Sequence, residues 1–159
     1  MEIKKYLKEK RINFKEFSHN PVYTVEDTKK EGIYEKIKGI HSKNLFLKER
    51  KSRRFYLVVM QENKPLNIKE LEEKLKYKLK FANPENLKEI LGLTPGSVSP
   101  FGLINDKINK TILLIDKDVW NADFVSFHPN INTETLQLSK ENFHKYVNSL
   151  KNEMKIIEQ

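Results

Sequence analysis

Segments typical of β-strands and of α-helices follow one another irregularly along this chain, and that order constrains its fold most. Apolar or alternating runs predict strands near residues 12–17, 41–48, 55–60, 111–116, 123–127 and 133–138. Helical spacing predicts helices over residues 2–10 and 25–38, and others beginning near residues 67, 83 and 139. Without a strict strand–helix–strand rhythm, this mixture favours an α/β fold around a mixed, partly closed, barrel-like sheet flanked by helices. No internal repeat or linker is present, so residues 1–159 are expected to form one domain.

Capping residues set the expected ends of these helices. Thr24 is a good N-cap for the helix over 25–38 and Gly39 should end it, although Gly32 lies inside. Asn67 opens the next helix, and Asn83 with Pro84 opens another. The expected apolar faces are Ile68, Leu71, Leu75 and Leu79 in the helix after Asn67, and Phe143, Tyr146, Val147, Leu150, Met154 and Ile157 in the last helix, which starts at Ser139.

The composition excludes several classes of chemistry. The chain has 159 residues, 38% of them hydrophobic, which is enough to bury a sizeable core. It contains no cysteine, which excludes disulfides, thiolate nucleophiles and cysteine-ligated metals and fits a reducing cytoplasm. No apolar run approaches the roughly 20 residues of a membrane span. The first residues also lack the apolar core of a signal peptide, so we expect a cytoplasmic protein with no membrane partner.

Basic residues are concentrated in one part of the chain. The net charge is +8, and residues 29–54 hold ten basic side chains against three acidic ones. That segment therefore carries most of the excess charge. A concentrated basic segment is typical of a protein with a polyanion partner such as a nucleic acid. A lysine-rich composition alone would explain many lysines but not their clustering.

Residues 122–136 place a histidine at a polar corner. His128 ends an apolar–polar alternation, and Pro129 then stops the strand because it has no N–H for the sheet ladder. Hydroxyl and amide side chains surround the histidine in sequence: Ser126, Asn130, Asn132, Thr133 and Thr135. Such a cluster suits a binding site, but it also suits a hairpin whose polar side chains satisfy turn backbone.

Three segments are candidates for the site: Ser42-Lys43-Asn44, Gly96-Ser97-Val98-Ser99-Pro100, and the corner with Ser126 and His128. The four histidines and the scattered acids have no metal-ligand spacing, so no metal site is predicted. The glycine-rich loop lacks the Gly-Lys-Ser/Thr end of a phosphate loop. No Gly-x-Ser-x-Gly elbow is present either, although a serine triad stays open.

Together and in this order, these motifs resemble a known family. Asn20-Pro-Val-Tyr-Thr-Val-Glu-Asp, Ser42-Lys-Asn-Leu-Phe-Leu-Lys, Gly96-Ser-Val-Ser-Pro-Phe-Gly and Phe127-His-Pro-Asn-Ile-Asn-Thr-Glu-Thr are similar to segments of the YbaK-type aminoacyl-tRNA editing family. The likeness is strongest to its freestanding, PrdX-like branch, the prolyl-tRNA editing proteins that clear alanine from mischarged tRNA(Pro). The resemblance implies a single α/β domain that hydrolyses the ester between an amino acid and the tRNA 3′ end, without a cofactor.

The resemblance also implies residue roles. Lys43 matches the family's essential lysine, Asn44 lies beside it, and His128 could orient the water or the ribose hydroxyl. The substrate-binding residues it implies are Thr24, Phe46, Gly96, Ser97, Val98, Pro100, Ser126 and Thr133. A pocket walled by Phe46, Val98 and Phe127 would admit alanine and exclude proline, and Lys29, Lys30 and Lys36 would contact the tRNA.

Other readings stay open at this point. The cargo could be cysteine on tRNA(Pro) or another small amino acid, because pocket volume decides between them. A non-catalytic tRNA-binding module on the same fold would need the basic residues but not Lys43, Asn44, Gly96 and His128. A DNA-binding role lacks a helix-turn-helix or zinc finger. Prolyl-tRNA synthetase is a candidate partner that the sequence neither requires nor excludes.

Overall fold

The computed structural model describes residues 2–159, apart from the side chains of Val25 and Tyr34. Its strands are β1 (Lys15–Ser18), β2 (Ile40–Glu49), β3 (Phe55–Gln61), β4 (Leu79–Phe81), β5 (Thr111–Asp116), β6 (Phe124–Phe127), β7 (Glu134–Ser139) and β8 (Met154–Ile157). Its α-helices are α1 (Ile3–Glu9), α2 (Val25–Lys30), α3 (Ile33–Lys36), α4 (Ile68–Leu75), α5 (Pro84–Leu91), α6 (Lys117–Asn121) and α7 (Lys140–Ser149). A 3₁₀ helix, η1, spans Pro100–Asn105.

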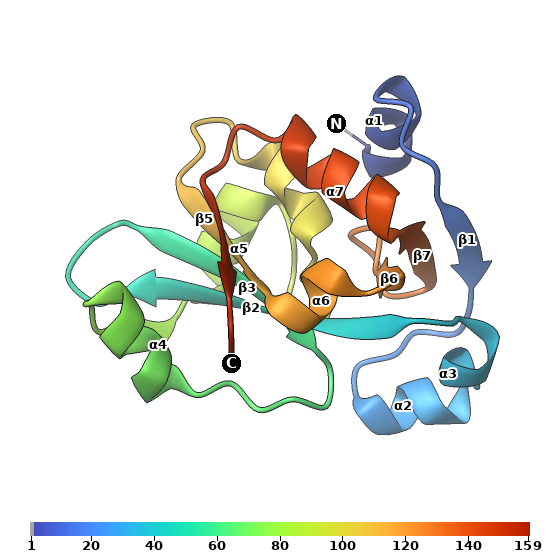
Figure 1. Cartoon of the computed structure of the whole chain (residues 1–159), viewed down its shortest axis with the longest axis horizontal. Coiled ribbons are helices and arrows are strands. Elements are labelled where there is room, and N and C mark those ends of the chain that lie inside the picture. Colours follow the sequence, from blue (N-terminus) through green and yellow to red (C-terminus); the bar gives the residue numbers. More distant parts are fainter. Residues whose placement is uncertain (1) are drawn as a thin grey trace.

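The strands form one mixed sheet in the order β1-β7-β6-β2-β3-β5-β8, with β4 paired to β2. The ten-residue β2 connects the two parts of this sheet. Its first residues pair in parallel with β6, and from Ser42 onward it pairs antiparallel with β3. Figure 1 shows helices on both sides of the strands, which confirms the expected α/β class with a mixed sheet.

The central strands β3 and β5 are apolar without alternation because both of their faces are buried. Leu57 and Val59 pack into a core with α1, α5 and α7, whereas Val58 and Met60 pack on the opposite face with α4. Burying side chains of this size contributes about 1.5–3 kcal/mol each. The sheet is therefore a rigid platform, and the polar start of β2 lies at its margin.

Three helix predictions needed correction. The helix expected over 25–38 is two short helices, because Gly32 adopts a left-handed φ of 66° between them. Leu79 does not extend the stripe of α4, since Lys76 ends that helix in a left-handed conformation and Leu79 begins β4. The last helix stops at Ser149 and the chain turns extended at Leu150, so that Met154–Ile157 can pair in parallel with β5.

Other predictions were confirmed. The caps Thr24, Asn67, Asn83 and Ser139 each accept a hydrogen bond from the N–H three residues later. The predicted strands at 41–48, 55–60, 111–116, 123–127 and 133–138 correspond to β2, β3, β5, β6 and β7. The first strand is shorter than expected, since β1 begins only at Lys15, and α6 was not predicted.

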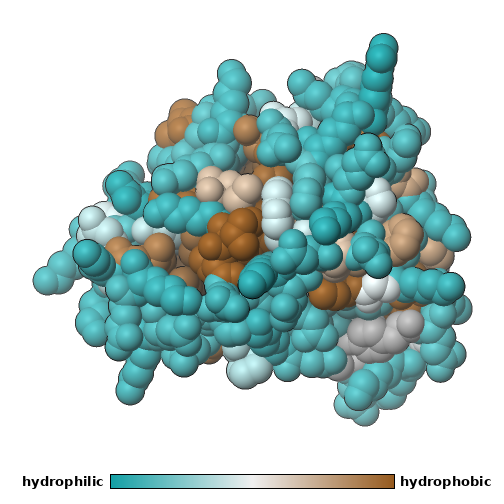
Figure 2. Space-filling model, in the orientation of Figure 1, coloured by the Kyte–Doolittle hydropathy of each residue, from teal (hydrophilic) through white to brown (hydrophobic). Residues whose placement is uncertain are grey.

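Hydrophilic side chains cover most of the face seen in Figure 2, with a small hydrophobic area near its centre. This distribution fits the high content of charged residues. Within residues 2–159, no helix is both long and apolar enough to cross a membrane.

Candidate active site

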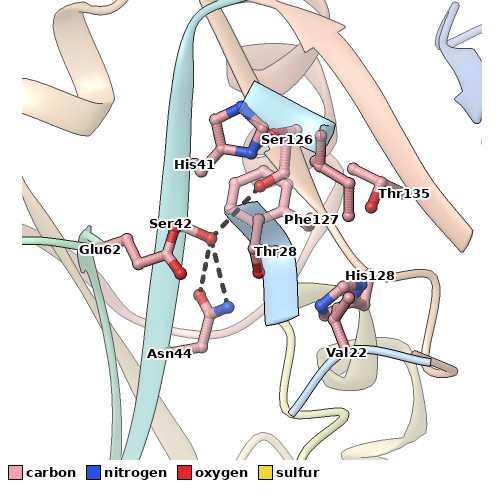
Figure 3. Close-up of a pocket in the computed structure, with 11 residues that line it drawn as sticks. Val22, Thr28, His41, Ser42, Asn44, Glu62, Ser126, Phe127, His128 and Thr135 are labelled. Atoms are coloured by element: carbon pink, nitrogen blue, oxygen red, sulfur yellow. Dashed lines mark hydrogen bonds between the residues drawn. The ribbon is translucent and has the colours of Figure 1, made fainter. Parts of the chain in front are cut away.

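A cleft of about 360 Å³ opens where four segments far apart in sequence meet. Its walls come from Val22, Tyr23, Thr24 and Thr28, from Ser42, Lys43 and Asn44 at the start of β2, from Gly96 and Val98, and from His128 just after β6. Glu62, which follows β3, completes the lining. A smaller cavity of about 50 Å³ continues inward toward Ser126 and Phe127 (Figure 3). All three segments that the sequence singled out therefore meet at one place.

Hydrogen bonds from Asn44 join the walls of the cleft. Its Nδ2 group donates to the carbonyl oxygen of Val98 at 3.1 Å and reaches Oγ of Ser42 at 3.2 Å. The hydroxyl of Ser42 lies 3.4 Å from the carbonyl oxygen of Ser126 on β6. The side chain of Asn44 thus holds the loop that contains Gly96 against β2.

His128 is held in one orientation at the junction of the two cavities. Its Nδ1 lies 2.9 Å from the backbone carbonyl oxygen of Glu134, which can only accept, so Nδ1 carries the proton. Burial lowers the pKa of the imidazole below its ordinary value of 6.5, more than the carbonyl of Glu134 raises it, and nearby His19 and His41 lower it further. His128 is therefore neutral at pH 7, with Nε2 as a hydrogen-bond acceptor.

Two further histidines organise the inner cavity, and sequence analysis missed both. His41 places Nε2 2.9 Å from the carbonyl oxygen of Ile37, which leaves Nδ1 to accept from the hydroxyl of Ser126 at 3.3 Å. His19 stands edge-on to His128 with ring centroids 5.9 Å apart, and its Nε2 lies 2.8 Å from Oγ1 of Thr135. The pairing of His41 with Ser126 across β2 and β6 is a tertiary register that one sequence does not reveal.

The loop around Gly96 lines the cleft because its backbone is left-handed there, with φ at 91°. A Cβ at this position would lie 3.4 Å from the ring of Tyr23 on the opposite wall. Ser97 and Pro100 lie outside the lining of both cavities. Ser97 is buried and closes a turn onto Thr94, while Pro100 starts η1 and its carbonyl accepts from Tyr146 at 2.7 Å. These two residues support the loop from behind.

Two more expected substrate-binding residues are placed elsewhere. Phe46 is buried and stacks on Phe55 with ring centroids 5.2 Å apart, so it belongs to the core rather than to a pocket wall. Phe46 lies on the same face of β2 as Asn44, two residues further along, where core residues cover that face. Thr133 lies outside both linings, and its carbonyl accepts from the N–H of His19. Thr24 does line the cleft while also capping α2.

The basic segment 29–54 does not form a single surface. Lys29, Lys30 and Lys36 are exposed on α2 and α3, near the cleft. The basic turn between β2 and β3 lies at the other end of β2, and ten strand residues span about 30 Å. Figure 1 shows this separation, with α2 and α3 at one end of β2 and the hairpin turn at the other. Of the basic residues in the segment, Lys43 is the one placed in the cleft lining.

Metal chemistry finds no support in the side chains that the structure describes. Among them, no three His, Cys, Asp or Glu residues are grouped so that they could hold a metal ion. What the cleft offers instead is an ammonium group, an oriented neutral imidazole and a loop of close-approaching backbone. Such groups suit the hydrolysis of an already labile carbonyl compound.

Comparison with known proteins gives the class. A family model described as "Aminoacyl-tRNA editing domain" matches residues 19–146, most of the chain. The chain belongs to this family of editing deacylases, which are hydrolases that act on tRNA. The family resemblance seen in the sequence motifs is thereby confirmed.

Individual relatives agree along nearly the whole length. The chain is 40% identical to prolyl-tRNA editing protein ProX of Acetoanaerobium sticklandii over 153 residues, 96% of this chain and 92% of that protein. It is 32% identical to prolyl-tRNA synthetase associated domain-containing protein 1 of Bos taurus, covering 81% and 77%. The crystal structure of hypothetical protein APE2540 superposes with a TM-score of 0.74 over 97% of both chains at 19% identity, which shows the shared fold.

Proposed function

We propose that this protein hydrolyses Ala-tRNA(Pro) in trans, acting as one domain over residues 1–159. The observation that carries the proposal is the convergence of Lys43, Asn44, Gly96 and His128 on one cleft. The name of its Acetoanaerobium relative, a prolyl-tRNA editing protein, supports tRNA(Pro) as the tRNA. Prolyl-tRNA synthetase is the enzyme whose errors such an activity would correct.

The reaction needs little covalent help from the protein. Water adds to the ester carbonyl, the bond to the ribose oxygen breaks, that oxygen takes the proton, and free alanine leaves. The ammonium of Lys43 would stabilise the negative charge that develops on the carbonyl oxygen. The left-handed backbone at Gly96, which carries no side chain, would let the substrate approach this loop closely. The neutral imidazole of His128 can accept a hydrogen bond from the attacking water or from the ribose hydroxyl.

Selection of alanine would rest on size. A synthetase cannot reject a smaller apolar side chain strongly, because a methylene is worth only about 1–3 kcal/mol of discrimination. A second site that admits only small side chains solves this problem. With Phe46 in the core, Val98 and Tyr23 are the side chains in the cleft lining that can limit its width near Gly96.

The deciding experiment is single-turnover deacylation of tRNA(Pro) charged with alanine, cysteine or proline, at saturating enzyme. We expect alanine to be released at least about 10-fold faster than proline, the scale of discrimination by size. Fastest release of cysteine would replace alanine as the cargo. Binding of charged tRNA without release of any of the three would favour a tRNA-binding module instead.

A further inference from the structure

The cleft is much larger than the alanyl group of the proposed substrate. Its volume of about 360 Å³ falls in the range of pockets that hold whole small-molecule ligands. The inner cavity, at about 50 Å³, has room for a small group but not for a nucleoside. The end of a tRNA brings a ribose and an adenine base together with the amino acid. In the proposed reaction, that nucleoside therefore lies in the outer cleft.

Tyr23 gives the outer cleft an exposed aromatic surface. The residue is 70% exposed, so its ring contributes little to the core. A single exposed tyrosine elsewhere on the surface would need no explanation, but this one lines the cleft. Among the described residues of the lining, it is the one with a six-membered aromatic ring. One edge of the ring faces the loop, since a Cβ at Gly96 would lie 3.4 Å from Cδ1 and 3.7 Å from Cε1. Much of the ring is left open to a ligand.

The backbone on both sides of Tyr23 is held in place. Its own N–H donates to Oδ2 of Asp27 at 3.1 Å, and the next residue, Thr24, caps α2. The preceding residue, Val22, is buried and lines the inner cavity together with His128 (Figure 3). The ring is thus attached at a fixed point, one residue away from the inner cavity.

A nucleobase is the part of the substrate that suits such a ring. Proteins that bind single-stranded nucleic acid combine basic groups along the backbone with aromatic side chains on which bases stack. Both kinds of group are present here, because the exposed Lys29 and Lys30 lie on α2, which begins two residues after Tyr23. The methyl group of an alanine would cover only a small part of the ring, whereas a base would cover its whole face.

We propose that the ring of Tyr23 stacks on the adenine base at the 3′ end of the tRNA and so positions the ester near Lys43 and His128. This inference rests on the proposed deacylase function, since it concerns the same cleft, but not on the identity of the amino acid. Because all tRNAs end in the same nucleotide, the contact adds affinity and alignment without selecting among tRNAs. Tyr23 is then a positioning residue, which orients the reacting ester through the base.

The test places a fluorescent base at the contact. Uncharged tRNA(Pro) with 2-aminopurine as its 3′-terminal base is titrated with the wild-type protein, Tyr23→Phe and Tyr23→Ala. Formation of the complex is followed separately by the anisotropy of a label at the 5′ end. Stacking on an aromatic ring quenches 2-aminopurine, so we expect quenching at saturation by the wild type and Tyr23→Phe and its loss in Tyr23→Ala. Tyr23→Ala should also bind about 10-fold or more weakly, the scale of one base–aromatic stack.

An abasic 3′ end and a second tyrosine provide the controls. tRNA(Pro) that ends in an abasic ribose should bind the wild type as weakly as Tyr23→Ala binds the intact tRNA. It should lose no further affinity in Tyr23→Ala, because the two changes remove the same contact. Tyr77→Ala removes a ring that is 50% exposed, between α4 and β4 and outside the cleft lining, and should quench and bind like the wild type.

The outcomes separate this inference from the proposed function. A wild-type complex that forms without quenching, or quenching that persists in Tyr23→Ala, overturns the role of Tyr23 and leaves the deacylase proposal standing. Quenching that depends on Tyr23, in a protein that releases no amino acid, supports the base contact and counts against deacylation. Absence of any complex with tRNA(Pro) contradicts both.

Discussion

His128 donates its Nδ1–H to the backbone carbonyl of Glu134 at 2.9 Å, across the turn that joins β6 to β7. The corner therefore holds the imidazole in one tautomer, with Nε2 left as the acceptor. The polar residues around His128 in the sequence had two readings, a site or a plain hairpin. Both apply in part, because the turn supplies the carbonyl that orients the histidine lining the cleft.

The first prediction concerns pH. Because burial lowers the pKa of His128, the imidazole stays neutral until the pH falls below 6.5, and deacylation should be level above that and decline below it. The unfolded chain binds this proton more readily than the native protein, so the free energy of unfolding should also decrease as the pH falls through the same range. His128→Gln should lower the rate and flatten both profiles. An acid limb that persists in His128→Gln would assign it to another group.

The second prediction concerns Lys43. Lys43→Ala should reduce single-turnover deacylation by about 10²-fold or more, the scale of losing one preorganised electrostatic donor. Stability should change by no more than about 0.5 kcal/mol, since Lys43 is half-buried and outside the hydrophobic core. Lys43→Arg should recover little, since a planar guanidinium cannot place its charge where a compact ammonium lies. The matched control is Lys48→Ala, further along β2 and outside the cleft lining, which should hydrolyse Ala-tRNA(Pro) at the wild-type rate. A wild-type rate in Lys43→Ala would refute the catalytic role of Lys43.

The third prediction compares two glycines in the left-handed region. Gly96→Ala, at a φ of 91°, should cost about 1 kcal/mol of stability in a thermal or urea unfolding experiment. Gly92→Ala, at a φ of 67°, should cost at least as much, because its Cβ would also lie 3.0 Å from Nδ2 of Asn105. Only Gly96→Ala should reduce deacylation, by about 10-fold or more, because its methyl would occupy space in the cleft beside the ring of Tyr23. Gly92 ends α5, away from the site. Equal turnover by the two variants would remove the loop from the mechanism.

Local signals in the sequence were enough to predict most elements, and the family resemblance of the three motif segments implied that they share one site. The caps and the apolar runs act through hydrogen bonds and burial within a few residues, so they can be recognised from the sequence alone. The prediction from apolar periodicity was wrong where pairing between distant strands decides the structure. Residues 154–157 form a strand that pairs with β5 instead of extending α7. The resemblance placed Phe46 in the pocket, and one sequence could not show that its ring stacks on Phe55 in the neighbouring strand. His41 and Glu62 were missed for the same reason, since register alone brings them to the site.

The last prediction separates the two ends of the basic segment. If tRNA lies along α2, replacing Lys29 and Lys30 with alanine should weaken binding of tRNA(Pro), measured by fluorescence anisotropy between about 50 and 200 mM salt, where counterion release is pronounced. The slope of log K against log salt should also become shallower, by about 0.7–0.9 for each phosphate that the variant no longer neutralises. The matched control replaces Lys51 and Arg53, equally exposed but in the hairpin turn at the far end of β2, and should leave both quantities nearly unchanged. Equal losses of affinity in the two double variants would mean that the tRNA spans the whole length of β2. An affinity that does not depend on salt would show that the basic segment is not the tRNA surface.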